Sequence, residues 1–216
     1  VAVEACRGRH EGQKCYICLE AVHPHTGEGL VRGCACGDRD GVSSPELGVA
    51  HVSCLARQAK ELVEEAEEND LGVKALNESW VRWYKCSLCE QEYHGVARCA
   101  LGWACWKTYV GLPEEHWARR FAMGVLGNGL SDAGHGDDAL TVGEAEVSLL
   151  RRVGASQDHI LCVEGNLAST YIQVGRFEEA SRILSNVYSG RLKFNGEEQE
   201  ETLRAANNYA DSLIYL

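Results

Sequence analysis

The sequence predicts a small α+β module that is rich in cysteine, followed by an all-α array of helical repeats. Ten of the 11 Cys residues lie before residue 106. From about residue 115 onward, apolar residues recur at helical spacing, Gly residues separate the segments, and similar segments return after 41 or 42 residues. We therefore divide the chain into a module over 10–95, a helical connector over 96–115, and repeats over 116–216.

The composition is that of a folded protein, with 45% hydrophobic and 25% charged residues among 216. A formal net charge of −11 argues against nucleic acid or anionic lipid as a partner. The N-terminus lacks the apolar core of a signal peptide, and no uninterrupted apolar stretch is long enough to span a membrane. We therefore expect a soluble cytoplasmic or nuclear protein in which clustered cysteines bind metal. We also expect a longer parent protein, because the initial Met is missing and the last repeat is incomplete.

Within the module, seven cysteines and one histidine fall into four close pairs. The pairs are Cys15 and Cys18, Cys34 and Cys36, His51 and Cys54, and Cys86 and Cys89. A spacer of one or two residues lets a tight turn present two donor atoms to one ion. Zn²⁺ takes four nitrogen or sulfur ligands in a tetrahedron, so eight ligands predict two zinc ions.

One helix is expected between the third and fourth pairs, over residues 51–69. Its apolar residues recur three or four positions apart and form one face: Leu55, Ala59, Leu62, Val63 and Ala66. Five Glu residues between 61 and 68 crowd the other face. We interpret this acidic face as a solvated surface; the alternative is a docking surface for a basic partner.

The ligand order over residues 15–89 resembles the RING-CH variant of the RING finger. The tight second pair, the long gap after Cys54 and the aromatic Tyr93 after the last ligand are similar to that family. The resemblance implies cross-braced zinc sites. The first site would hold Cys15, Cys18, His51 and Cys54, and the second would hold Cys34, Cys36, Cys86 and Cys89.

The same resemblance implies a function in ubiquitin transfer, since a RING positions a charged ubiquitin-conjugating enzyme and has no catalytic residue of its own. It implies contacts to that enzyme from Ile17 and Leu88, inside the two CxxC pairs, and from Trp80 and Trp83. For the two Trp residues, the alternative is a place in the core. The residue after the last ligand is Glu90, where many active RINGs carry a basic residue. Either activity is weak or another residue supplies the basic group.

Two other functions share the ligand pattern. The first is a zinc-dependent protein-interaction adaptor without ligase activity. The second is a PHD-like reader of histone tails, which has the same ligand order. The long spacer over 37–50 and the presence of Tyr84 where a PHD finger has Trp favour RING-CH over PHD.

Four cysteines remain outside the pairs: Cys6, Cys99, Cys105 and Cys162. A third zinc site from His94, Cys99, Cys105 and His116 is a weak alternative, because their spacing is irregular. Free Cys is commonly buried as a small apolar residue, and we expect Cys162 to lie in the core of a helix face.

The second half of the chain contains repeated sequence segments. Segment 166–171 (NLASTY) recurs at 208–213 (NYADSL), and 126–130 aligns with 167–171, as Gly134 does with Gly175. This pattern resembles tetratricopeptide repeats of the longer kinesin-light-chain type, which implies a protein or peptide ligand. In the first repeat, Gly143 and Glu146 stand where the second helix would have apolar residues.

Overall fold

The computed structural model describes residues 12–36 and 48–216, and it divides into two units. The first unit ends at Gly111 and the second is Leu112–Leu216. Cys6, the start of the expected module at residue 10, and most of the spacer before His51 lie outside the described residues.

The described helices of the first unit surround a small core. They are α2 (Val52–Glu68), α3 (Gly72–Trp80), the 3-10 helix η2 (Val81–Trp83) and α4 (Gly95–Tyr109). The helix predicted over 51–69 is confirmed as α2, since Leu55, Ala59, Val63 and Ala66 are buried on one face. The opposite face is exposed to solvent. It includes an ion pair between Lys60 and Glu64, one helical turn apart, whose charged atoms lie 3.4 Å from each other.

The β component that we expected is small. Among the described residues of the first unit, the extended backbone forms two isolated antiparallel bridges, Val31 with Ala50 and Lys85 with Glu92. Each bridge lies beside ligand pairs, so backbone hydrogen bonds hold the loops where regular strands would otherwise do so.

Trp80 and Trp83 lie in the interior of the first unit, with 6% and 0% of their surface exposed. The ring centroid of Tyr109, at the end of α4, lies 5.3 Å from that of Trp80 and 5.8 Å from that of Trp83. Aromatic contacts at these distances anchor α3, η2 and α4 to one another. The two Trp side chains therefore belong to the core, which was the alternative to an exposed groove.

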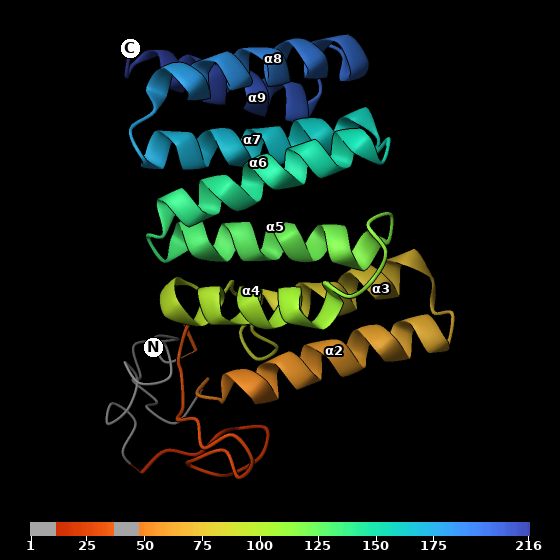
Figure 1. The fold of residues 1–216 in the computed structure, drawn as a ribbon, viewed down its shortest axis with the longest axis vertical. Coiled ribbons are helices and arrows are strands. Elements are labelled where there is room, and N and C mark those ends of the chain that lie inside the picture. The colour runs from red at the N-terminus through yellow and green to blue at the C-terminus, as the bar shows by residue number, and fades with distance from the viewer. Residues whose placement is uncertain (1–11, 37–47) are drawn as a thin grey trace. The chain divides into compact units, whose positions relative to one another are not determined.

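The second unit is an array of helices joined by short turns (Figure 1). The helices are α5 (Trp117–Asp132), α6 (Gly136–Arg152), α7 (Gln157–Gln173), α8 (Phe177–Asn195) and α9 (Glu200–Leu213). Each helix packs against the next along the chain, and α5 also contacts α7. The all-α array predicted for this half is confirmed. In the described part of the chain, no helix combines the length and the apolar character of a membrane span.

Glycine sets the turns of the array. Gly134, Gly154 and Gly175 each lie two residues beyond a helix end and have positive φ angles of 81°, 66° and 78°. After each glycine, the next amide donates to the carbonyl five residues earlier at 2.9 Å. A left-handed glycine followed by this hydrogen bond ends a helix, and Gly134 and Gly175 lie one repeat of 41 residues apart. The buried side chains of Leu140, Leu150 and Leu167 then fill the space between α6 and α7.

Candidate metal centre

The structure brings the four ligand pairs into two compact clusters. The first contains Cys15, Cys18, His51 and Cys54, and the second contains Cys34, Cys36, Cys86 and Cys89. Within each cluster, one donor atom from every residue lies within 4.8 Å of all the others. Three thiols with an imidazole, and four thiols, are donor sets that suit tetrahedral Zn²⁺.

The two CxxC turns have the same local structure. The amides of Ile17 and Leu88 point at the sulfurs of Cys15 and Cys86, each with an N···S distance of 3.4 Å. In each turn, the residue after the second cysteine, Leu19 or Glu90, has a left-handed φ of 65° or 58°. Their amides donate back to the carbonyls of Cys15 and Cys86 at 2.8 and 3.0 Å. Amides that point at sulfur stabilise thiolates, so both turns are prepared to bind a cation.

His51 is oriented by its backbone partner. Its Nε2 lies 3.4 Å from the carbonyl oxygen of Ala21, and its Nδ1 lies 3.3 Å from the sulfur of Cys18 and 3.7 Å from that of Cys54. If Nε2 donates to Ala21, the lone pair of Nδ1 faces the cluster, which is the usual arrangement of a metal-binding histidine. Burial lowers the pKa of His51, so the imidazole is held in the neutral form that binds metal.

The thiols of the second cluster cannot all ionise independently. The hydrogen bond from Cys34 lowers the pKa of Cys86, and the same bond raises the pKa of Cys34. Burial raises the pKa of Cys36, whose sulfur lies 3.6 Å from that of Cys86. Without a cation, these crowded sulfurs retain protons that a bound metal would displace.

A glycine supports the second cluster, and sequence reasoning missed it. Gly48 has a φ of +78°, and a Cβ placed there would lie 2.5 Å from the Cβ of Cys36 and 3.1 Å from the sulfur of Cys34. Only glycine combines this backbone conformation with this close approach. A Gly just before the expected helix was visible in the sequence, but its contact with the second pair depends on the fold.

Hydrogen bonds outside the clusters hold the first CxxC turn and the start of α2. The side chain of Glu28 accepts from the amide of Ser53 at 2.7 Å and also from its hydroxyl. The hydroxyl groups of Tyr16 and Ser87 lie 3.3 Å apart and join the two CxxC turns. None of these four polar residues was singled out from the sequence, because each acts through a partner that is distant along the chain.

The expected enzyme-contact residues are placed differently from one another. Leu88 has 47% of its surface exposed, whereas Ile17 is partly buried against the core that surrounds the clusters. Glu90 is mostly exposed, and its carboxylate accepts from Arg82 Nη1 at 3.0 Å. The same guanidinium nitrogen lies 3.3 Å from the carbonyl oxygen of Cys86, so a basic group lies beside the last turn.

The remaining cysteines do not make a third centre. In residues 12–36 and 48–216, the groups of three or more candidate ligands are the two clusters, and His94, Cys99, Cys105 and His116 do not form another. Cys105 is fully buried, and burial raises its pKa. The expectation that Cys162 is a core residue is wrong. Cys162 is exposed because its neighbours Leu161 and Val163 take the buried positions on α7.

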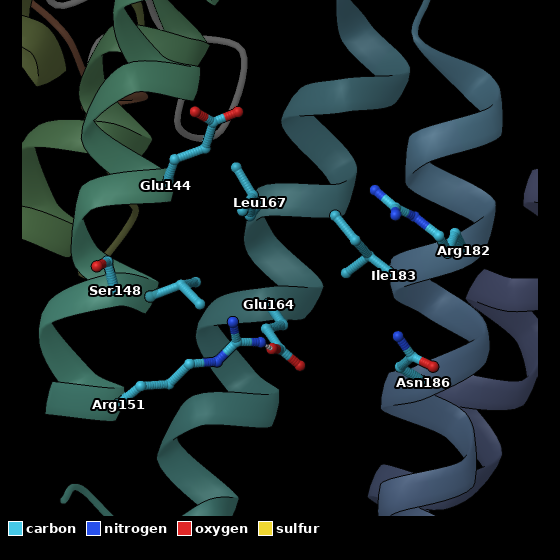
Figure 2. Close-up of a pocket in the computed structure, with 9 residues that line it drawn as sticks. Glu144, Ser148, Arg151, Glu164, Leu167, Arg182, Ile183 and Asn186 are labelled. Carbon is cyan, nitrogen blue, oxygen red and sulfur yellow. Dashed lines mark hydrogen bonds and ion pairs between the residues drawn. The ribbon is translucent and has the colours of Figure 1, made fainter.

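The helical array carries grooves of its own. One groove of about 470 Å³ lies over α6, α7 and α8, with Leu167 and Ile183 among its apolar lining (Figure 2). At its edges, Arg151 pairs with Glu164. A second groove of about 300 Å³ is lined by α7, α8 and α9 and includes Cys162 and Asn166. Grooves of mixed character between successive helices suit protein segments better than small polar metabolites.

Known proteins resemble the chain in fold rather than in sequence. No family model matches it, and neither does any curated protein. The crystal structure of BtubC (BKLC) from P. vanneervenii aligns with a TM-score of 0.50 and 14% identity, over 76% of this chain. The alignment spans 64% of BtubC, which is less than two thirds of its length.

Two crystal structures of a Podosopora anserina kinesin light chain candidate with nearly identical TPR-like repeats also align, one of them a point variant. Both have TM-scores of 0.47 at 18% identity, cover 76% of this chain, and are themselves covered over 88% and 87%. The helix pairs, their period and the likeness in fold to BtubC identify a TPR-like helical array.

Proposed function

We propose that the first unit is a RING-CH-type zinc module that recruits a ubiquitin-conjugating enzyme, and that the TPR-like array binds a protein substrate. The observation that carries this proposal is the interleaving of the ligand pairs. The first and third pairs share one cluster, and the second and fourth pairs share the other. Interleaving ties the two sites into one unit, as the resemblance to RING-CH implies.

Zinc would stabilise the module rather than take part in a reaction. The donors fit the ion, because seven thiols and one neutral imidazole make two four-ligand sets. Binding would displace the protons of the crowded thiols and add a link between loops whose described β structure is two isolated bridges. The chain's own contribution is the fixed geometry of its turns.

The surface for the conjugating enzyme would combine the two CxxC turns. The contact between Tyr16 and Ser87 supports this, because these residues directly precede Ile17 and Leu88. Glu90 cannot donate a hydrogen bond to ubiquitin. Arg82, whose guanidinium lies 3.0 Å from the Glu90 carboxylate, would supply the basic group in its place.

The test is discharge of ubiquitin from a panel of charged conjugating enzymes by the purified, zinc-loaded chain. We expect discharge with at least one enzyme, and Ile17→Ala should reduce its rate about tenfold or more while the zinc content stays at two ions per chain. Val73→Ala is the matched control, since Val73 is 75% exposed on α3 and lies outside both turns. Inactivity of the zinc-loaded chain across a broad panel would refute ligase activity.

The second candidate is a non-catalytic adaptor, and Glu90 favours it because an acidic residue stands where many active RINGs have a basic one. An adaptor would bind two zinc ions, hold its protein ligand and discharge no ubiquitin. A PHD-like reader would instead bind unmodified or methylated histone-tail peptides, which a titration with such peptides would detect.

A further inference from the structure

A small niche lies between α5, α6 and α7, and glycine creates it. Gly124 and Gly127 on α5 and Gly143 on α6 line the niche, together with the apolar side chains of Val163 and Leu167. The cavity measures about 20 Å³, which is enough for one water-sized group. It opens beside the exposed side chains of two Asn residues, 128 on α5 and 166 on α7.

The carboxyl group of Glu146 lies in this niche with only 6% of the residue exposed. A Cβ added to Gly124 would lie 3.1 Å from its Oε1, so the carboxyl group reaches the backbone of α5. None of the residues that line the niche carries a positive charge, and neither a hydrogen bond nor an ion pair is found for Glu146 in the described structure. Burial raises the pKa of Glu146 to about 8.

A buried carboxyl group without a partner is costly to keep, and an apolar residue would suit this position in a helix pair better. A cation that entered the niche would compensate that cost. The size of the cavity selects the cation, because an ammonium group is about as large as a water molecule and a guanidinium group is larger. The methylene chain behind the ammonium group would stay outside the cavity, at its mouth.

We propose that this niche binds the side-chain ammonium group of a lysine, with the Glu146 carboxylate as its counter-ion and the amide oxygens of Asn128 and Asn166 as further acceptors. The lysine would belong to the protein ligand of the array, so its biological use rests on the proposed function. The binding chemistry itself does not depend on zinc or on ubiquitin transfer. The acidic chain, with a net charge of −11, favours a basic partner.

The test uses n-butylammonium chloride as the probe of the 216-residue chain, with NMR of the Glu146 side-chain carboxyl carbon and of the Asn128 and Asn166 side-chain amides. We expect saturable shifts at millimolar probe and a fall in the pKa of Glu146. Butanol lacks the charge and n-butylguanidinium is too large, so neither should saturate these signals. Alaninamide tests a peptide N-terminus as the source, and tighter binding by alaninamide would overturn the assignment to lysine.

Substitutions distinguish a binding role for Glu146 from that of an unfavourable polar residue in the core. Glu146→Gln keeps the shape and should weaken n-butylammonium about tenfold or more. Gly124→Ala should weaken it as well, because the new methyl group meets the carboxylate. Gly165→Ala is the matched control, since Gly165 occupies the equivalent position 41 residues later and a Cβ there meets nothing within 4 Å.

Unchanged binding in Glu146→Gln, or no saturable shift in the wild type, would overturn the lysine niche and leave Glu146 as a protonated residue that contacts water. Neither outcome touches the ubiquitin-discharge assay, so failure here is distinguishable from failure of the proposed function. Absence of ubiquitin discharge together with intact n-butylammonium binding would refute the proposed function and leave the lysine niche standing.

Discussion

The two units of the chain are stabilised by different means. The first unit concentrates Cys and His in two four-residue clusters, and its described loops form only two isolated bridges. The second unit has no such cluster among its residues, and buried Leu, Val and Ala side chains hold its helices together. The loops that carry the clusters have little regular structure of their own and need another source of stability, whereas successive helices build a core by stacking.

This comparison predicts that the units respond to different perturbations. Metal removal should act on the first unit and loss of apolar volume on the second. If chelation unfolded the array, or if a core substitution in the array released zinc from the first unit, the two units would not fold independently.

Metal removal should have the largest effect. Structural zinc sites of this donor type contribute about 10 kcal/mol or more to folding at neutral pH, so a strong chelator should unfold the loops around both clusters. The measurement is backbone-amide NMR with and without chelator, together with metal analysis. We expect signals from residues 12–36, 48–54 and 84–93 to collapse while those of α5 to α9 persist. Retention of all signals after complete metal loss would contradict a structural metal centre.

Loss of apolar volume from the array should have the next largest effect. Leu150 is fully buried on α6, and Leu150→Ala should destabilise the second unit by about 2–5 kcal/mol, because a cavity replaces the side chain. Urea unfolding followed by circular dichroism of the zinc-loaded chain measures this. The control is Leu203→Ala, since Leu203 is 54% exposed on α9 and should change stability by less than about 0.5 kcal/mol.

Much of this organisation could be predicted from local sequence pattern. The apolar spacing over 51–69 predicts α2, and the period of 41 or 42 residues predicts the helix pairs with Gly134 and Gly175 at their turns. The close spacing of donors also indicates which residues gather in pairs. These features follow from the spacing of residue types along the chain, so a single sequence is enough to predict them.

Features that depend on distant contacts could not be predicted. The acceptor for His51 is the carbonyl of Ala21, and no side-chain pattern marks a backbone acceptor. Cys162 lies in an apolar stretch, but the packing of α7 on two neighbours decides which of its residues are exposed. Glu146 looked merely unfavourable in sequence, and only the glycines of α5 and α6 around it reveal a niche.

The smallest expected effect is that of a substitution at Gly48, which packs against the second cluster. Gly48→Ala forces a methyl group to within 2.5 Å of the Cβ of Cys36, and it also strains a left-handed backbone. Displacing residues that position ligands typically lowers metal affinity about 10–100-fold, so zinc should leave the second cluster first while the first cluster keeps its ion. Competition with a chromophoric chelator measures both affinities.

The matched control for Gly48→Ala is Gly72→Ala. Gly72 has a φ of +82°, similar to that of Gly48, but a Cβ there meets nothing within 4 Å. It therefore carries the backbone strain of about 1 kcal/mol without the contact with cysteine. Equal zinc affinities in the two variants would assign the whole effect to backbone strain. A selective loss from the second cluster in Gly48→Ala alone would show that close packing of glycine on sulfur, and not only the ligand set, determines how tightly this unit holds its metal.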